Sequence, residues 1–193
     1  TLRQPLEERE VTVSRVEASV TYPANFQLVA AMNPCPCGHF PDRSRCRCTD
    51  GQITRYLQKV SGPMLDRIDI CVEASPITYG DIRSSGNNES SREIRARVEQ
   101  ARKIQGERFA GENIRCNGEM SGRHIRKFCW LGREEEKFME EIFKKLALSA
   151  RMHDRILKVA RTTADLAEEE KIRLADLCEA VSYVKSRDKF WGN

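Results

Sequence analysis

The chain of 193 residues contains no Gly-Lys pair, so the phosphate-binding loop G-x-x-x-x-G-K-[ST] is absent from it. Its apolar runs are far shorter than a membrane span, and its first residues lack the basic and apolar regions of a secretory signal. Internal repeats and low-complexity tracts are also missing. These absences predict a cytoplasmic protein with no membrane partner, and they exclude a complete phosphate-loop nucleotide site within this chain.

Cysteine is the residue type that stands out, because the chain has eight of them beside 39% hydrophobic and 32% charged residues. The length of the chain and the lack of a secretory signal predict a reducing compartment, which argues against a disulfide scaffold. The net charge of +4 is mildly basic. It permits a nucleic-acid partner without requiring one.

Apolar patterns in the first part of the chain predict strands. Alternation on either side of a short break predicts a β-hairpin over 10–22. The continuous run FQLVAAM, 26–32, predicts a buried parallel strand, and the alternation in RIDICVE, 67–73, predicts another. A short helix is expected from Asp50 to about Val60, before a Ser-Gly-Pro break.

The composition then changes. The segment 76–90 is rich in serine, glycine and asparagine and predicts a linker. Beyond it, caps and helical apolar spacings predict helices over 91–109, 122–128, 134–146 and 150–167, and from 174 onwards. The expected fold class is therefore an α/β fragment over 1–75 followed by an all-α domain over 91–193.

Four cysteines form two dyads, Cys35-x-Cys37 and Cys46-x-Cys48, with eight residues between them. Paired dyads around a short loop supply four thiolates to a tetrahedral zinc, in a closed structural site rather than a catalytic one. The spacing of one residue inside each dyad departs from the usual two. Two disulfides or four unliganded thiols are therefore alternatives, and His39 is a possible substitute ligand. Three arginines in the loop would offset the thiolate charge.

Three stretches, AAMNPCPCG, SGPMLDRIDICVE and LSARMHDRILKVARTTADLA, together resemble the C-terminal part of a Mg-chelatase-related AAA+ ATPase of the ComM type. EVTVSR and VTYPANFQLVAAMNP fit the hairpin and the following strand of that family. The resemblance covers nearly the whole chain and is weakest over about 76–120. It implies the C-terminal half of an AAA+ core, with a hairpin and a cysteine loop, followed by a helical lid domain.

The resemblance assigns roles to polar side chains of the core. Asn33 matches sensor 1, whose amide donates to the γ-phosphate and accepts from the attacking water. Without the resemblance, Asn-Pro at this point is a turn. Arg67, in LDRID, matches the arginine finger, which supplies a cation to the charge that develops on the transferred phosphoryl group. Its alternative is a surface arginine paired with Asp66 or Asp69.

Two further sets of arginines follow from the resemblance. Arg151 matches sensor 2 near the start of a lid helix, where an arginine and the helix N-terminus both favour a phosphate. Arg155, one turn on, is the second candidate for this role, and an ordinary solvated arginine is the alternative. Arg9 and Arg15 are candidate DNA contacts, since such motors often place this hairpin against DNA in the ring pore; arginines that only keep an exposed hairpin soluble are the alternative.

The parent function that the resemblance implies is ATP-driven DNA branch migration in recombination and transformation, by a homo-oligomeric, hexameric ring that uses ATP and Mg²⁺. The phosphate loop and an acidic strand motif are expected upstream of Thr1. The chain is thus expected to be a fragment that is inactive as an ATPase alone. Two alternatives are an ATPase subunit that drives magnesium insertion into a porphyrin, and a non-enzymatic zinc-ribbon nucleic-acid module.

Overall fold

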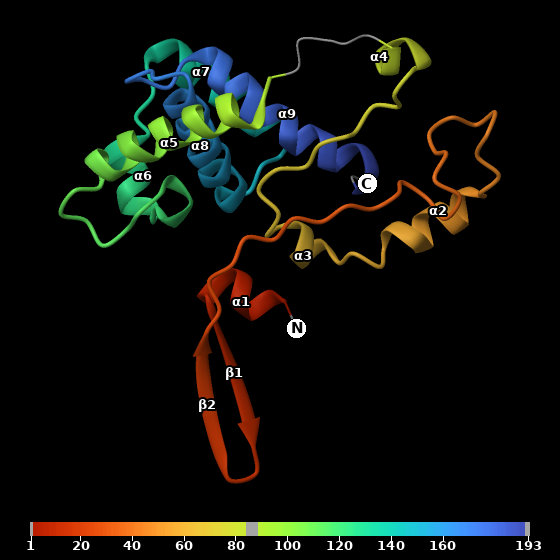
Figure 1. Cartoon of the computed structure of the whole chain (residues 1–193), viewed down its shortest axis with the longest axis horizontal. Helices are drawn as coiled ribbons and strands as arrows, with labels where there is room; N and C mark the ends of the chain where they lie inside the picture. The colour runs from red at the N-terminus through yellow and green to blue at the C-terminus, as the bar shows by residue number, and fades with distance from the viewer. Residues whose placement is uncertain (1, 84–88, 192–193) are drawn as a thin grey trace. The chain divides into compact units, whose positions relative to one another are not determined.

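The computed structural model describes residues 2–83 and 89–191, which form two compact units. Residues 2–69 and 187–191 belong to the first unit, and the described residues between 70 and 186 belong to the second. Figure 1 labels the helices and strands of both. The last helix, α9 (Leu174–Trp191), contributes residues to each unit.

The first unit begins with a short helix and a β-hairpin. The helix is α1 (Arg3–Glu8), and the hairpin consists of β1 (Glu10–Arg15) and β2 (Ala18–Pro23). The strands pair antiparallel, with Val13 opposite Val20. Because successive side chains of a strand point to opposite faces, one face of the hairpin is mainly apolar and the other carries hydroxyl groups. The predicted hairpin is therefore confirmed.

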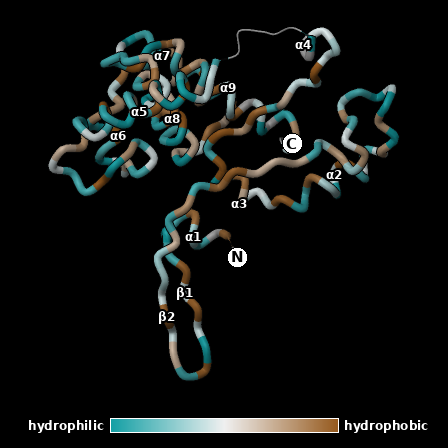
Figure 2. Tube along the Cα trace, in the orientation of Figure 1, coloured by the Kyte–Doolittle hydropathy of each residue, from teal (hydrophilic) through white to brown (hydrophobic). Residues whose placement is uncertain are grey.

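The segments 26–32 and 67–73 are not strands, and the prediction of strands there is wrong. A strand needs a neighbour that pairs its backbone amides and carbonyls. The hairpin is the only sheet in the part of the chain that the structure describes. The side chains of Val29 and Val72 are accordingly 84% and 71% exposed. The apolar residues of 26–32 are brown in Figure 2.

Two helices complete the first unit before the C-terminal turn of α9 joins it. The helix expected from Asp50 is present as α2 (Asp50–Leu57), and Thr49 and Gln52 form a capping box at its start. A single turn, α3 (Gly62–Leu65), follows with proline in its first turn. The small core of this unit consists of Cys35, Cys46, Ile53 and Leu57, with Phe40, Cys48, Tyr56, Phe190 and Trp191 packed against it.

The second unit contains helices and no strand among its described residues. Its elements before α9 are α4 (Tyr79–Arg83), α5 (Ser91–Arg108), the 3₁₀ turn η1 (Asn117–Glu119), α6 (Gly122–Phe128), α7 (Arg133–Lys145) and α8 (Ala150–Leu166). The predicted caps are present, because the hydroxyls of Ser90 and Ser149 accept from the amides of Glu93 and Met152 at 3.3 and 3.2 Å. The α/β fragment with a helical C-terminal part is thus confirmed in this coarse form.

The helices of the second unit enclose one apolar core and one buried polar network. The core is built from α6, α7, α8 and α9 and includes Ile125, Met139, Ile156 and Leu177. Beside it lies Asp165, a fully buried carboxylate that accepts hydrogen bonds from Arg108, Arg161 and Asn117. A buried charge is costly unless it is paired and hydrogen-bonded, and this network meets that requirement.

The predicted linker, 76–90, falls partly outside the described residues, which omit 84–88. Within its first part the structure shows the short helix α4. Among the described residues, every helix is too short or too polar to span a membrane.

Candidate metal centre and nucleotide-site residues

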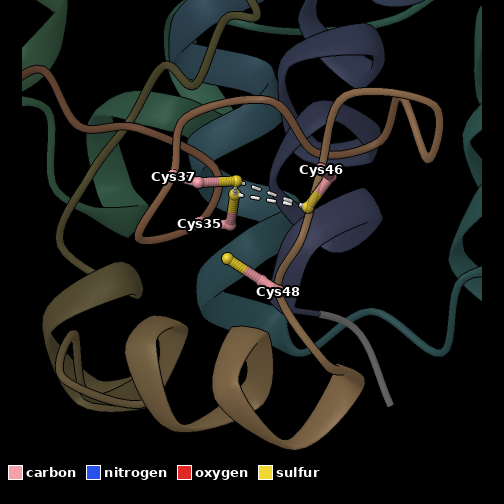
Figure 3. Close-up of side chains that lie close together, drawn as sticks. All are labelled: Cys35, Cys37, Cys46 and Cys48. Carbon is pink, nitrogen blue, oxygen red and sulfur yellow. Dashed lines mark hydrogen bonds between the residues drawn. The ribbon is translucent and has the colours of Figure 1, made fainter.

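The structure brings the four predicted cysteine ligands together. The sulfurs of Cys35, Cys37, Cys46 and Cys48 all lie within 4.8 Å of one another. The Sγ–Sγ distances are 3.4 Å for Cys35–Cys37, 3.8 Å for Cys35–Cys46 and 3.6 Å for Cys37–Cys46. Figure 3 shows the four side chains converging. A tetrahedral zinc with Zn–S bonds of about 2.3 Å holds its sulfurs about 3.8 Å apart, so the cluster has the size of a zinc site.

The alternatives for the cysteines fit less well. All four are free thiols in the structure, and their separations are far longer than the S–S bond of about 2.05 Å. His39 is exposed and is not a member of the cluster. Four sulfurs that converge without bonding one another are the donor set of a soft or borderline metal ion.

Local turns place these sulfurs. The amide of Gly38 donates to the Cys35 carbonyl at 3.0 Å, and Gly38 has a φ of 81°, in the left-handed region that glycine adopts without strain. The amide of Cys46 donates to the Asp42 carbonyl at 2.8 Å. Each dyad is therefore folded by a turn that its own sequence encodes.

The thiols differ in how readily they ionise. The backbone amide of His39 lowers the pKa of the Cys37 thiol to about 6. Desolvation raises the pKa of Cys48 to about 12 and also raises the pKa of Cys46. Thiolates in mutual contact repel one another, so all four ionise together only around a cation. Arg45 and Arg47 line a recess with Cys37, in keeping with the predicted charge offset.

Asn33, the sensor 1 candidate, lies beside this loop. A Cβ placed on Gly38 would be 3.7 Å from Cγ and Nδ2 of Asn33, which is ordinary van der Waals contact. Asn33 is otherwise exposed. The tight turn that follows Cys35 therefore brings the backbone of the cysteine loop against the candidate amide.

Arg67, the finger candidate, follows α3 and is paired within its own chain. Its Nη2 lies 2.6 Å from Oε2 of Glu7, and its Nη1 donates to the carbonyl of Pro63. Its Nε is buried and has no hydrogen-bond partner. Asp66, which the sequence offers as a partner, instead pairs with Arg187 at 3.3 Å.

Arg151 and Arg155 belong to the second unit, on the first two turns of α8. Arg151 is exposed and follows the cap residue Ser149 by two positions, whereas Arg155 is half-buried. Their side chains lie on the N-terminal part of a 17-residue helix, where the helix dipole favours anions.

Arg9 and Arg15 frame the hairpin. Arg9 ends α1 with a left-handed φ of 60°, and its carbonyl accepts from the amide of Ala24 at 2.6 Å, which closes the base of the hairpin. Arg15 is the last residue of β1, opposite Ala18. By alternation Arg15 shares the apolar face of the hairpin. Both arginines are exposed.

Sequence reasoning missed three groups of residues, two of them around the candidate sites. Phe190 and Trp191 pack on the cysteine core, and Glu7 pairs with Arg67. Both contacts join distant parts of the chain, and no local pattern signals them. The pair Arg161 and Asp165 carried a signal, since two charges spaced by four residues lie on the apolar face of a predicted helix.

Two family models match the chain. One, described as magnesium chelatase, subunit ChlI, covers residues 1–82, and the other, described as magnesium chelatase, subunit ChlI C-terminal, covers residues 88–184. The chain belongs to the magnesium chelatase ChlI family.

Similar proteins narrow the relationship within that family. Competence protein ComM of Haemophilus influenzae is 43% identical over 183 residues, which make up 94% of this chain and 35% of that protein. Uncharacterized protein YifB of Escherichia coli K12 is 43% identical over 184 residues, with the same coverage of 94% and 35%. An uncharacterized protein of Mycobacterium bovis is 36% identical over 182 residues, 94% of this chain and 36% of that protein. The chain thus spans about a third of the length of these relatives, and the predicted resemblance to ComM-type proteins is confirmed.

Proposed function

We propose that this chain is the C-terminal part of an AAA+ ring motor that couples ATP hydrolysis to DNA branch migration in recombination and transformation. The observation that supports this proposal most strongly is the 43% identity to competence protein ComM over 94% of the chain. The motor is a homo-oligomeric, hexameric ring in the cytoplasm, and its partner is DNA. The hairpin arginines Arg9 and Arg15 contact that DNA.

ATP and Mg²⁺ bind largely through residues that this chain lacks, because it has no phosphate-binding loop. The chain supplies the other half of the site. Asn33 orients the attacking water, Arg67 donates to the phosphoryl charge of a neighbouring subunit, and Arg151, with Arg155 as second candidate, binds phosphate as sensor 2. The buried Nε of Arg67 without a partner fits a guanidinium that has an anionic ligand in another state.

The cysteine cluster holds a structural Zn²⁺ in this proposal. Four protein sulfurs fill a tetrahedral coordination shell, so the ion has no open position for substrate or water. Its role is to order the loop beside Asn33, since that side chain lies next to the turn at Gly38. The ion therefore contributes to folding rather than to bond breaking.

The family description favours a second candidate, an ATPase subunit that drives magnesium insertion into a porphyrin. Binding of branched duplex DNA by the full-length protein distinguishes the two, because only the motor needs it. A non-enzymatic zinc-ribbon module would bind nucleic acid with no dependence on nucleotide.

The test uses the full-length protein that carries this chain. Arg67→Ala is expected to leave nucleotide binding nearly intact and to lower hydrolysis by about three orders of magnitude, the usual contribution of a finger. Asn33→Ala is expected to spare binding and impair hydrolysis. Arg55→Ala, which removes an exposed arginine of α2 in the same unit, is the matched control and should change neither.

Mixed rings decide whether Arg67 acts on a neighbour. A protomer that lacks Arg67 keeps its own phosphate loop, and a protomer mutated in that loop keeps Arg67. Mixing the two should restore part of the hydrolysis wherever an intact finger faces an intact loop. Mixed rings that assemble and show no recovery at any ratio would refute the assignment.

A further inference from the structure

Arg67 is held by its own chain in this structure. Glu7 lies 2.6 Å from Nη2, the Pro63 carbonyl accepts from Nη1, and the side chain is only 14% exposed. The third nitrogen, Nε, is buried without a hydrogen-bond partner. The guanidinium is therefore turned into the first unit, and a nucleotide on a neighbouring subunit of the proposed ring cannot receive it in this position.

We propose that Glu7 is a positioning residue that withholds Arg67 from the neighbouring subunit until a phosphoryl group competes for it. The inference rests on the proposed role of Arg67 as a finger. Carboxylate and phosphate oxygens bind the same planar fork of donors. A guanidinium paired with Glu7 at 2.6 Å thus has to leave that carboxylate before it reaches a phosphate.

The ion pair between Glu7 and Arg67 is of a kind that forms and breaks readily. Glu7 is 42% exposed, so water stabilises its carboxylate when the arginine departs. Part-exposed ion pairs contribute little to stability, and their exchange is easy. The Nε of Arg67 has no hydrogen-bond partner in the present position, so an acceptor that binds it elsewhere adds a hydrogen bond that Glu7 does not provide.

Glu7 is also connected through the backbone to the hairpin that is proposed to contact DNA. Glu7 is the penultimate residue of α1, and Arg9 caps that helix directly before β1 begins at Glu10. The Arg9 carbonyl binds the Ala24 amide at 2.6 Å, so the helix end and the hairpin base are joined. The residue that holds the finger candidate is thus attached to the element proposed to touch DNA.

The contact itself is tested on this chain with a dicarbonyl reagent that modifies accessible arginines, with rates mapped by peptide mass spectrometry. Glu7→Gln is expected to raise the modification rate of Arg67 by about two- to five-fold, the range for a part-exposed ion pair. Glu7→Asp keeps the negative charge on a shorter side chain. The modification rate of Arg67 in this variant should therefore lie between the rates in the wild type and in Glu7→Gln. Glu8→Gln, on the same helix, is the matched control, and exposed Arg55 is the internal reference.

The consequence is tested in the full-length protein. Glu7→Gln is expected to raise basal ATP hydrolysis by about two- to five-fold, and the double variant with Arg67→Ala should show none of that gain. Equal Arg67 reactivity in wild type and Glu7→Gln would overturn the proposal, as would hydrolysis that stays level or falls when reactivity rises. If Glu7→Gln fails to fold, Glu7→Asp takes its place in both measurements.

Failure of the finger assignment gives a different result. Hydrolysis that survives Arg67→Ala refutes the proposed function and with it the withholding role, even if Arg67 becomes more reactive in Glu7→Gln. Hydrolysis that is lost in Arg67→Ala and unchanged in Glu7→Gln refutes the withholding role alone.

Discussion

The indole Nε1 of Trp191 donates a hydrogen bond to the backbone carbonyl of Leu57, 3.1 Å away and separated by 134 positions in the sequence. Leu57 ends α2 and belongs to the same buried cluster as Cys35 and Cys46. The last turn of α9 therefore closes over the cysteine core. This places a natural fluorophore beside the candidate metal centre.

Removal of the metal by a chelator is expected to change the fluorescence of Trp191 and not that of Trp130, the only other tryptophan in the chain. Purified without added metal, the chain should contain about one zinc, measured by elemental analysis. In Trp130→Phe, chelation should shift emission to longer wavelength, because loss of the ion disorders the loop that Trp191 covers. In Trp191→Phe, the remaining Trp130, 54% exposed in the second unit, should not respond. A metal-free chain with a melting temperature that chelation does not change would contradict the zinc assignment.

Cys46→Ser is expected to lose the metal and unfold the loop while the helices of the second unit stay formed. The reason is that the core of the first unit contains Cys46 and is separate from the helical core. Far-UV circular dichroism and metal content measure the two effects. Cys178→Ser removes an exposed thiol of α9 and should retain the metal; equal metal loss in both variants would argue against a site made by the two dyads.

Asp165→Asn is expected to destabilise the second unit by about 3 kcal/mol or more, because the buried Arg161 and the half-buried Arg108 lose the charge that compensates them. Asp165 accepts from Nη1 of Arg108 at 2.7 Å and from Nε of Arg161 at 3.1 Å. Denaturant unfolding followed by Trp130 emission measures the change. Asp154→Asn, a part-exposed carboxylate on the same helix, should cost less than about 1 kcal/mol, and equal costs would mean that the network is not a stabilising unit.

Ala147→Gly is expected to stabilise the second unit by about 1 kcal/mol. Ala147 follows α7 with a φ of 45°, a left-handed conformation that costs an L-residue about 1–2 kcal/mol and costs glycine nothing. Ala96→Gly lies at an exposed position inside α5. This change should lower the free energy of unfolding by about 1 kcal/mol. Two changes of the same sign in thermal unfolding would argue against the left-handed cap.

The isolated chain is expected to bind ATP weakly and not to hydrolyse it. The phosphate-binding loop is absent from the sequence, and Asn33 and Arg67 do not cradle phosphates by themselves. Equilibrium dialysis and phosphate release measure binding and turnover. Turnover by the purified chain that Arg67→Ala abolishes would contradict this expectation.

Local patterns predicted the longer helices because these carry their own signals, whereas the short helices α3 and α4 were not predicted. Ser90 with Glu93 and Ser149 at the start of α8 mark helix starts that the structure reproduces. The cysteine cluster was equally predictable, since both dyads lie within one loop. The conformation of segments 26–32 and 67–73 was not predictable in this way. An apolar run indicates burial, but it becomes a strand only where another strand pairs with it. No periodic pattern in the sequence predicts the ion pair between Glu7 and Arg67.

The exposed run 26–32 has a consequence for handling the chain in solution. FQLVAAM contains no charge, proline or glycine, and its backbone is not in a sheet. Seven-residue segments of this composition form intermolecular β-structure when they are exposed. The chain should therefore self-associate with rising concentration, and its colloidal behaviour should improve most from a single lysine at Val29, whose side chain faces solvent in the structure.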